Sequence, residues 1–146
     1  MEQFIYISNP IHQLLIPVLI GSKMFFSLVV APNTFINLNE TNARIFIRSI
    51  FPKLYLWCLI LSLLISIALI FSNPSFSFIF FLISIGYFYS RQFLMQRINE
   101  VSDKKKKKEH DKKTFKRLHN LSVSIFIIQL ILMTTIYFLS RTQLVF

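Results

Sequence analysis

The sequence is poor in charge and in glycine, and it contains a single cysteine. Charged residues make up 15% of the 146-residue chain, and its two glycines are Gly21 and Gly86. There is no glycine-rich loop to hold phosphates, no HExxH or GxSxG motif, and no pair of carboxylates within an apolar run. The lone cysteine, Cys58, excludes a disulfide framework and a CxxC metal or redox site. Catalysis therefore has no positive support, and we expect no metal centre.

Long apolar runs dominate what is present. The chain is 54% hydrophobic and 16% aromatic, with a mean hydropathy of +0.58, and its charges cluster between the apolar runs. A membrane-spanning helix needs on the order of 20 mainly apolar residues. Four segments are long enough, at about 11–36, 51–72, 75–97 and 119–140. We predict an all-α polytopic membrane protein, a four-helix transmembrane bundle that forms one membrane domain over residues 1–146.

The segments between these spans predict how they are joined. Residues 72–75 read Ser-Asn-Pro-Ser, which is typical of a tight turn, so spans two and three should form a helical hairpin. Capping residues precede 43–51, where Arg44 and Arg48 share a helix face, and this predicts a short interfacial helix before Pro52 begins span two. Pro17 gives the long first span a reason to bend.

Basic residues predict the orientation, because membrane proteins concentrate Lys and Arg in cytoplasmic loops. When Lys and Arg are counted by predicted side of the membrane, fourteen of the sixteen lie on the side of loops 37–50 and 98–117, and one, Arg141, lies on the other side. We expect those loops to be cytoplasmic and both termini to lie outside, as in a bacterial inner membrane. Residues 1–13 lack the basic start and cleavage site of a signal peptide, so the first span should stay in the mature protein.

The basic run Lys104–Lys108 lies in the predicted cytoplasmic loop 98–117. Such a run attracts anionic lipid headgroups at about 1 kcal/mol per basic residue near the surface. The blander interpretation is a disordered loop that fixes orientation. We expect no nucleic acid partner, because the run has no interleaved aromatic residues.

Lys23 is the most informative polar residue, because it lies about midway along the first span. An ammonium group there costs a few kcal/mol unless it is paired, neutralised or able to reach the surface. Helical counting puts Ser62, Gly86 and Gln129 at a similar depth, so Lys23, Ser62 and Gln129 are a candidate intramembrane polar site. One interpretation is a site for an anion, a proton or a lipid headgroup. The other is a lysine hydrogen-bonded to Gln129 and to carbonyl groups, or one that snorkels to the surface beside a kink at Pro17.

Two histidines raise a haem or metal hypothesis, since imidazole is a common axial ligand on membrane helices. His12 begins the first span and His119 begins the fourth. With the predicted topology they lie on opposite sides of the bilayer, so they should not share a ligand. An interfacial or capping role is the alternative for each. We expect no cofactor, with haem as the alternative.

Several short motifs occur in order along the chain. Val-x-Ala-Pro-x-x-Phe ends the first span, Phe-Pro-x-x-Tyr begins the second, and Leu-His-x-x-Ser opens the fourth. The motif residues are Ala31, Pro32, Phe35, Phe51, Pro52, Tyr55, His119 and Ser122. This pattern resembles the transmembrane-protein-205-like family, formerly domain of unknown function 4149. The resemblance implies four membrane helices and brings no established biochemical activity with it.

Three functional hypotheses follow. The first is a small integral membrane protein with a structural, scaffold or stress-related role, which could form a homo-oligomer because few polar groups lie within its spans. The second is a haem- or metal-associated redox component that uses His12 or His119. The third is a small transporter or channel subunit built around Lys23.

Overall fold

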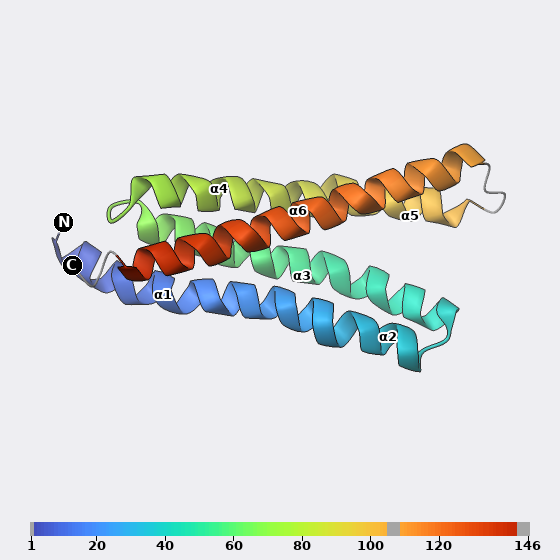
Figure 1. The fold of residues 1–146 in the computed structure, drawn as a ribbon, viewed down its shortest axis with the longest axis horizontal. Coiled ribbons are helices and arrows are strands. Elements are labelled where there is room, and N and C mark those ends of the chain that lie inside the picture. Colours follow the sequence, from blue (N-terminus) through green and yellow to red (C-terminus); the bar gives the residue numbers. More distant parts are fainter. Residues whose placement is uncertain (1, 105–108, 143–146) are drawn as a thin grey trace.

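Four helical rods lie side by side in an elongated bundle (Figure 1). The computed structural model describes the backbone of residues 2–104 and 109–142, and the side chains of residues 11–104 and 109–140. The rods run up and down in turn, so that the turn between the second and third lies at one end of the bundle. The first rod ends and the second begins at the opposite end, where the third rod also ends and the fourth begins. We call this the loop end (Figure 1).

The first rod consists of α1 (Glu2–Phe25), the π-helical segment η1 (Phe26–Val30) and α2 (Ala31–Asn37). The backbone N–H of Ala31 donates to the carbonyl of Phe26, five residues earlier. Pro32 follows directly and has no N–H to donate, so the regular hydrogen-bond ladder must be adjusted around it. The departure from α-helical geometry therefore lies ahead of Pro32, whereas Pro17 stays within α1.

The second rod is a single helix, α3 (Glu40–Leu69). The Asn39 side chain caps it by accepting a 2.9 Å hydrogen bond from the backbone N–H of Asn42. The predicted short interfacial helix over residues 43–51 is therefore not a separate element but the first turns of α3. Pro52 lies inside the helix. It removes one backbone hydrogen bond, but no glycine or second turn residue follows it, and the helix continues.

The third rod comprises α4 (Pro74–Tyr89), the π-helical segment η2 (Ser90–Leu94) and α5 (Met95–Asp103). Asn73 accepts a 3.1 Å hydrogen bond from the N–H of Phe76, and Pro74 occupies the first turn of α4, where its missing N–H costs little. The fourth rod is α6 (Glu109–Thr142). The turn between α3 and α4 is thus as short as its sequence predicts.

Most of the segment 98–117 is helical, although we predicted a loop. Residues up to Asp103 belong to α5, and those from Glu109 belong to α6. Acidic residues in the first turn of α6 favour helix there, because they oppose the positive end of the helix dipole. Asp111 is buried and forms an ion pair with Lys104. The remainder of the predicted lysine run, residues 105–108, lies outside the described residues.

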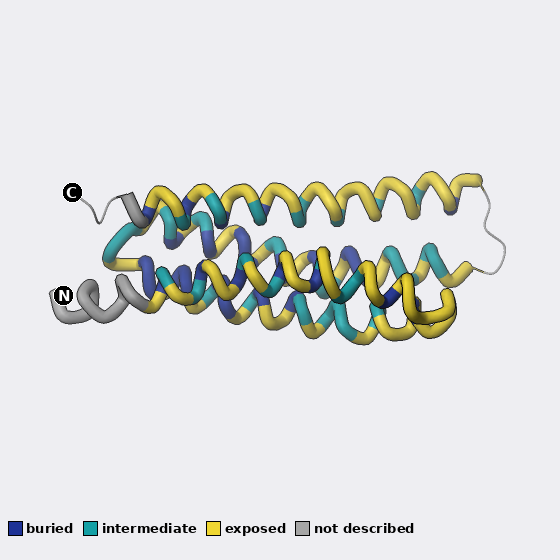
Figure 2. Tube along the Cα trace, turned by 60° about the horizontal axis from the view of Figure 1, so that its bottom comes forward, coloured by how far each residue is buried: buried dark blue, intermediate teal, exposed yellow. Residues whose placement is uncertain are grey.

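Within the described residues, four helical stretches are long and apolar enough to cross a membrane: Ile11–Asn37, Glu40–Leu69, Pro74–Asp103 and Glu109–Ser140. This confirms the predicted all-α class with four candidate membrane spans. Large apolar side chains cover the outside of the bundle, and much of the surface of α6 is exposed (Figure 2). An exterior of this kind suggests a lipid bilayer as its environment.

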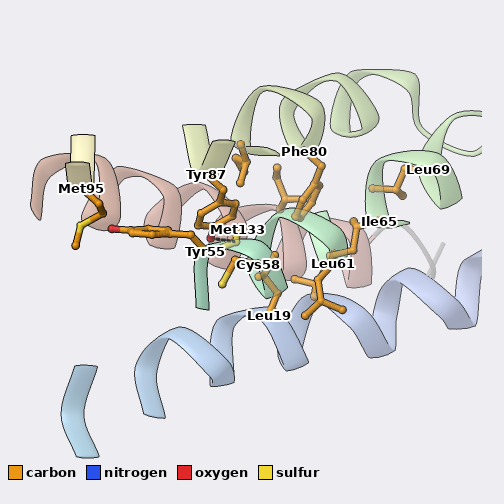
Figure 3. Close-up of a cluster of buried hydrophobic side chains, with 13 residues drawn as sticks. Leu19, Tyr55, Cys58, Leu61, Ile65, Leu69, Phe80, Tyr87, Met95 and Met133 are labelled. Carbon is orange, nitrogen blue, oxygen red and sulfur yellow. Dashed lines mark hydrogen bonds between the residues drawn. The ribbon is translucent and has the colours of Figure 1, made fainter. Parts of the chain in front are cut away.

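The tightly packed core lies between the middle of the bundle and the turn that joins α3 to α4. Figure 3 shows Leu19 of α1, Ile65 of α3, Phe80 of α4 and Met133 of α6 converging there, each at most 1% exposed. The apolar side chains of α3 and α4 make the most extensive helix–helix contact. Towards the loop end the packing changes, because the rods enclose a cavity there.

Candidate ligand-binding cavity

A cavity of about 680 Å³ lies among the four rods in the half of the bundle nearer the loop end. Each rod contributes one face. The α3 face is the clearest, because its lining residues follow the three- and four-residue spacing of one side of a helix. These are Glu40, Arg44, Ile47, Arg48, Phe51, Leu54, Tyr55 and Cys58. The walls are mainly apolar, and polar side chains gather at the inner end and at the mouth.

Lys23 lies at the inner end of the cavity and is only 2% exposed. Its Nζ donates to the carbonyl oxygen of Phe126 and to Oε1 of Gln129, both at 3.2 Å. The ammonium group also lies over two aromatic rings, 4.2 Å from the ring centroid of Phe126 and 5.2 Å from that of Tyr87. Cation–π contacts of this kind partly compensate for lost hydration.

Gln129 fixes the position of this lysine from the opposite rod. Its Nε2 donates a 3.2 Å hydrogen bond to the carbonyl of Ile83 on α4, while Oε1 accepts from Lys23. Gly86 provides the space, because a Cβ atom at that position would lie 2.6 Å from Nε2 of Gln129. One amide side chain therefore joins α1, α4 and α6 at a single level of the bundle.

The third member of the predicted polar layer is not part of this network. Ser62 is fully buried, but its hydroxyl donates to the carbonyl of Leu59 on its own helix, at 3.0 Å. The structure thus brings Lys23 and Gln129 together and leaves Ser62 bonded within α3. Helical counting gives the depth of a residue, but not the side of the helix on which it lies.

Other polar groups line the cavity near Lys23. Tyr55 of α3 and Ser122 of α6 both line it with hydroxyl-bearing side chains. Cys58 also lines the inner end, and Tyr87 donates to the sulfur of Met133 at 3.8 Å. The side chains of Tyr55, Tyr87 and Cys58 lie close together in Figure 3. The inner end therefore combines one ammonium group with hydroxyl and thiol groups.

Ion pairs lie at the mouth of the cavity. Arg44 pairs with Glu40 one turn earlier on α3. Arg48 reaches across to Asp103 at the end of α5, with its two terminal nitrogens 2.9 and 2.6 Å from the two carboxylate oxygens. These charges are partly or largely exposed, which identifies the loop end as the side on which the cavity meets solvent.

The two histidines lie at different levels of the bundle. His119 lines the cavity near its mouth, is exposed, and stacks on Phe115 with the ring planes 6° apart. His12 is buried on α1, on the far side of Lys23 from the cavity mouth. Eleven residues separate His12 from Lys23 and ten separate Gln129 from His119, so at 1.5 Å per residue the histidines are about 30 Å apart along the bundle. The structure does not bring them together.

Six of the eight motif residues line the cavity, namely Ala31, Phe35, Phe51, Tyr55, His119 and Ser122. The motif prolines, Pro32 and Pro52, shape the backbone of the rods that carry them. Sequence reasoning did not identify the cavity, nor the aromatic rings of Tyr87 and Phe126 around Lys23. The sequence signal that could have indicated the cavity was the helical spacing of the arginines and motif residues on α3, which places them on one side of the helix.

Comparison with known proteins places the chain in one family. The family model described as "Domain of unknown function (DUF4149)" matches residues 14–107, which is well over half of the chain. This match includes Lys23 and every cavity-lining residue of the first three rods, but not α6. No curated protein and no solved structure matches the chain.

Proposed function

The chain belongs to the DUF4149 family, a domain of unknown function, and we propose that it is a membrane protein that binds a small amphipathic molecule in the cavity. The observation that carries this proposal is a buried lysine at the closed end of a cavity whose walls are mainly apolar. Close-packed protein interiors contain few voids larger than a water molecule. Ligand sites in proteins have volumes of roughly 300–1,000 Å³, and this cavity of about 680 Å³ falls within that range.

The lining supports an amphipathic ligand. Apolar side chains form the walls, including Phe26, Phe51 and Phe126, and they would exclude a fully polar solute. Lys23 and the Tyr55 and Ser122 hydroxyls offer hydrogen-bond donors at the inner end. A molecule with an apolar body and one polar end satisfies both regions.

The cavity has a closed inner end and a mouth at the loop end, and this supports ligand binding rather than a continuous pore. Beyond Lys23 the bundle is closed by the packed side chains of Leu19, Ile65 and Met133. We place the cavity mouth on the cytoplasmic side, since the excess of basic residues lies at the loop end. On this proposal the ligand enters from the cytoplasmic face or its lipid leaflet and leaves by the same route.

The cavity also bears on the other hypotheses. A purely structural role gives no reason for an unfilled interior beside a costly buried charge. A haem or metal role would have to use His119 at the mouth or His12 beyond the packed core, since the two are far apart. Among the described residues no group of three or more His, Cys, Asp or Glu side chains is arranged to hold a metal ion.

The proposal is tested by filling the cavity. Ala31→Phe places a large side chain in the cavity wall, and Val29→Phe places the same side chain on the exposed face of the same rod. Each protein is purified from its native membrane, and the small molecules that it releases on denaturation are identified by mass spectrometry. We expect one enriched amphipathic compound from the unmodified protein and from Val29→Phe, and at least about tenfold less from Ala31→Phe.

Two results would refute the proposal. One is the absence of any compound enriched over the surrounding membrane lipid in the unmodified protein. The other is equal enrichment in both variants, because a molecule that is indifferent to a phenylalanine at position 31 does not occupy the cavity.

A further inference from the structure

Lys23 has no carboxylate partner among the described residues. Its two hydrogen-bond acceptors, the Phe126 carbonyl and the Gln129 amide oxygen, are both neutral. A buried ammonium group is costly unless an opposite charge compensates it. Among the described residues that line the cavity, the acidic one is Glu40, which lies at the mouth and pairs with Arg44. The inner end of the cavity therefore carries an uncompensated positive charge.

The lysine also keeps hydrogen-bonding capacity for a ligand. An ammonium group has three N–H donors, and protein acceptors occupy two of those of Lys23. Lys23 is itself a lining residue of the cavity, although only 2% of its surface is exposed. A ligand that enters from the mouth meets this group last, because the packed core lies behind it.

The number of charges favours a carboxylate. A carboxylate carries one negative charge and matches the one lysine, whereas a phosphate monoester carries about −1.5 to −2 at pH 7 and needs more cations than this. The two arginines at the mouth do not meet that need, because Arg44 pairs with Glu40 and Arg48 pairs with Asp103.

The shape of the cavity favours a ligand with a single apolar chain. Its lining extends along the first rod from Lys23 to Phe35, a distance of about 18 Å at 1.5 Å per residue. Aromatic and aliphatic side chains line this length on all four rods. An apolar chain lying there is shielded from water, which favours its binding.

We propose that the cavity binds an aliphatic monocarboxylate head-inward, with the carboxylate on Lys23 and the chain directed towards the mouth. This inference rests on the proposed function and names the ligand class for the same site. The reverse pose, with the carboxylate at the mouth, would leave Lys23 buried against the apolar chain and uncompensated. Specificity then resides in one residue, because Lys23 alone distinguishes the acid from its uncharged analogue.

The test compares three probes that share one apolar chain: dodecanoate, dodecanol and dodecyl phosphate. Binding of each is measured by competition against radiolabelled dodecanoate, or by direct binding of radiolabelled dodecanol, with the full-length protein in nanodiscs and with empty nanodiscs as background. The variants are Lys23→Met, which removes the charge, and Gln129→Glu, which places a carboxylate beside Lys23. Lys53→Met is the matched control, because Lys53 is exposed and does not line the cavity.

We expect the unmodified protein and Lys53→Met to bind dodecanoate at least about tenfold more tightly than dodecanol, as a charge-assisted hydrogen bond predicts. Lys23→Met and Gln129→Glu should lose this preference while still binding dodecanol, which also shows that they are folded. Should Lys23→Met bind neither probe, loss of the preference in Gln129→Glu alone carries the inference.

Three outcomes would overturn the inference. If the unmodified protein binds dodecanoate and dodecanol equally, the charge of Lys23 does not select the ligand, although the cavity remains a ligand site. Tighter binding of dodecyl phosphate than of dodecanoate replaces the carboxylate with a phosphate. No binding of any probe by the unmodified protein removes the aliphatic ligand class, and the proposed function is then judged by the Ala31→Phe experiment alone.

Discussion

Gly86 lies directly against the side chain of Gln129 in the bundle interior. A methyl group there would come within 2.6 Å of Nε2 of Gln129, the amide group that donates to Ile83 and accepts from Lys23. The other glycine, Gly21, has nothing within 4 Å of the position that a Cβ atom would take. The two glycines of this chain thus differ in their surroundings, although both lie in helices.

We predict that Gly86→Ala destabilises the protein by about 1–3 kcal/mol, because Gln129 must move and leave buried polar groups unpaired. Gly21→Ala should leave stability unchanged or raise it by up to about 1 kcal/mol, as expected for a helical Gly→Ala change without a clash. Unfolding in mixed detergent micelles, followed by circular dichroism, gives both values. An equal effect of the two substitutions would contradict the packing around Gln129 described here.

At the residue scale, the depth of a residue along its membrane span is predictable from the sequence, but the direction in which its side chain points is not. Counting along the spans placed Lys23, Ser62 and Gln129 at one level, and the structure joins the first and third of these. Ser62 points elsewhere, because the rotation of α3 about its axis depends on packing against other helices. Tyr87 and Phe126 were missed for a related reason: in an apolar run, an aromatic residue beside a cation has no distinguishing pattern.

A pair of serines joins α3 to α4 near the turn between them. The Ser66 hydroxyl donates to the Ser77 carbonyl at 2.9 Å, and the Ser77 hydroxyl donates to the Ser66 carbonyl at 2.7 Å. Ser84 is also buried on α4, but its hydroxyl donates within that helix to the carbonyl of Phe81. Two serines of similar burial therefore differ in whether they connect helices.

We predict that Ser77→Ala lowers the free energy of unfolding by about 0.6 kcal/mol, the average for interhelical hydrogen bonds in a membrane protein, and by no more than about 1.7 kcal/mol, the maximum. Ser84→Ala should cost less, because its backbone acceptor keeps its helical hydrogen bond. The same unfolding measurement in micelles compares them. If Ser84→Ala proves the more costly of the two, the reciprocal bonds do not stabilise the hairpin.

At the element scale, prolines were informative in turns and misleading in helices. The Asn-Pro pair at residues 73–74 predicted the turn between α3 and α4, because it caps one helix and cannot continue the previous one. Pro52 predicted a break that the structure does not have, since α3 extends from Glu40 to Leu69 without interruption. Residues 98–103 and 109–117 are helical, although we predicted a loop there. In α6 the acidic residues of the first turn favour the helix, because they compensate the helix dipole and pair with neighbouring lysines.

For the whole molecule, composition was sufficient to predict four apolar helices, but not the cavity. The number of spans depends on the lengths of apolar runs, which can be counted along the chain. The cavity requires faces of four rods to converge without filling the space between them, and it depends on the rotation of every rod at once. The motif residues that line it are separated along the sequence by up to about ninety positions and meet only in the folded bundle.

The orientation of the bundle decides which compartment supplies the ligand, and it can be tested by labelling. In a Cys58→Ser background, Thr41→Cys and Ser75→Cys each place one thiol at an exposed first-turn position, on α3 at the loop end and on α4 at the opposite end. The excess of basic residues predicts that the loop end is cytoplasmic. A membrane-impermeant maleimide should therefore label Ser75→Cys in intact cells and Thr41→Cys only after permeabilisation. The reverse pattern would place the cavity mouth outside, and the ligand would then come from the external medium or the outer leaflet.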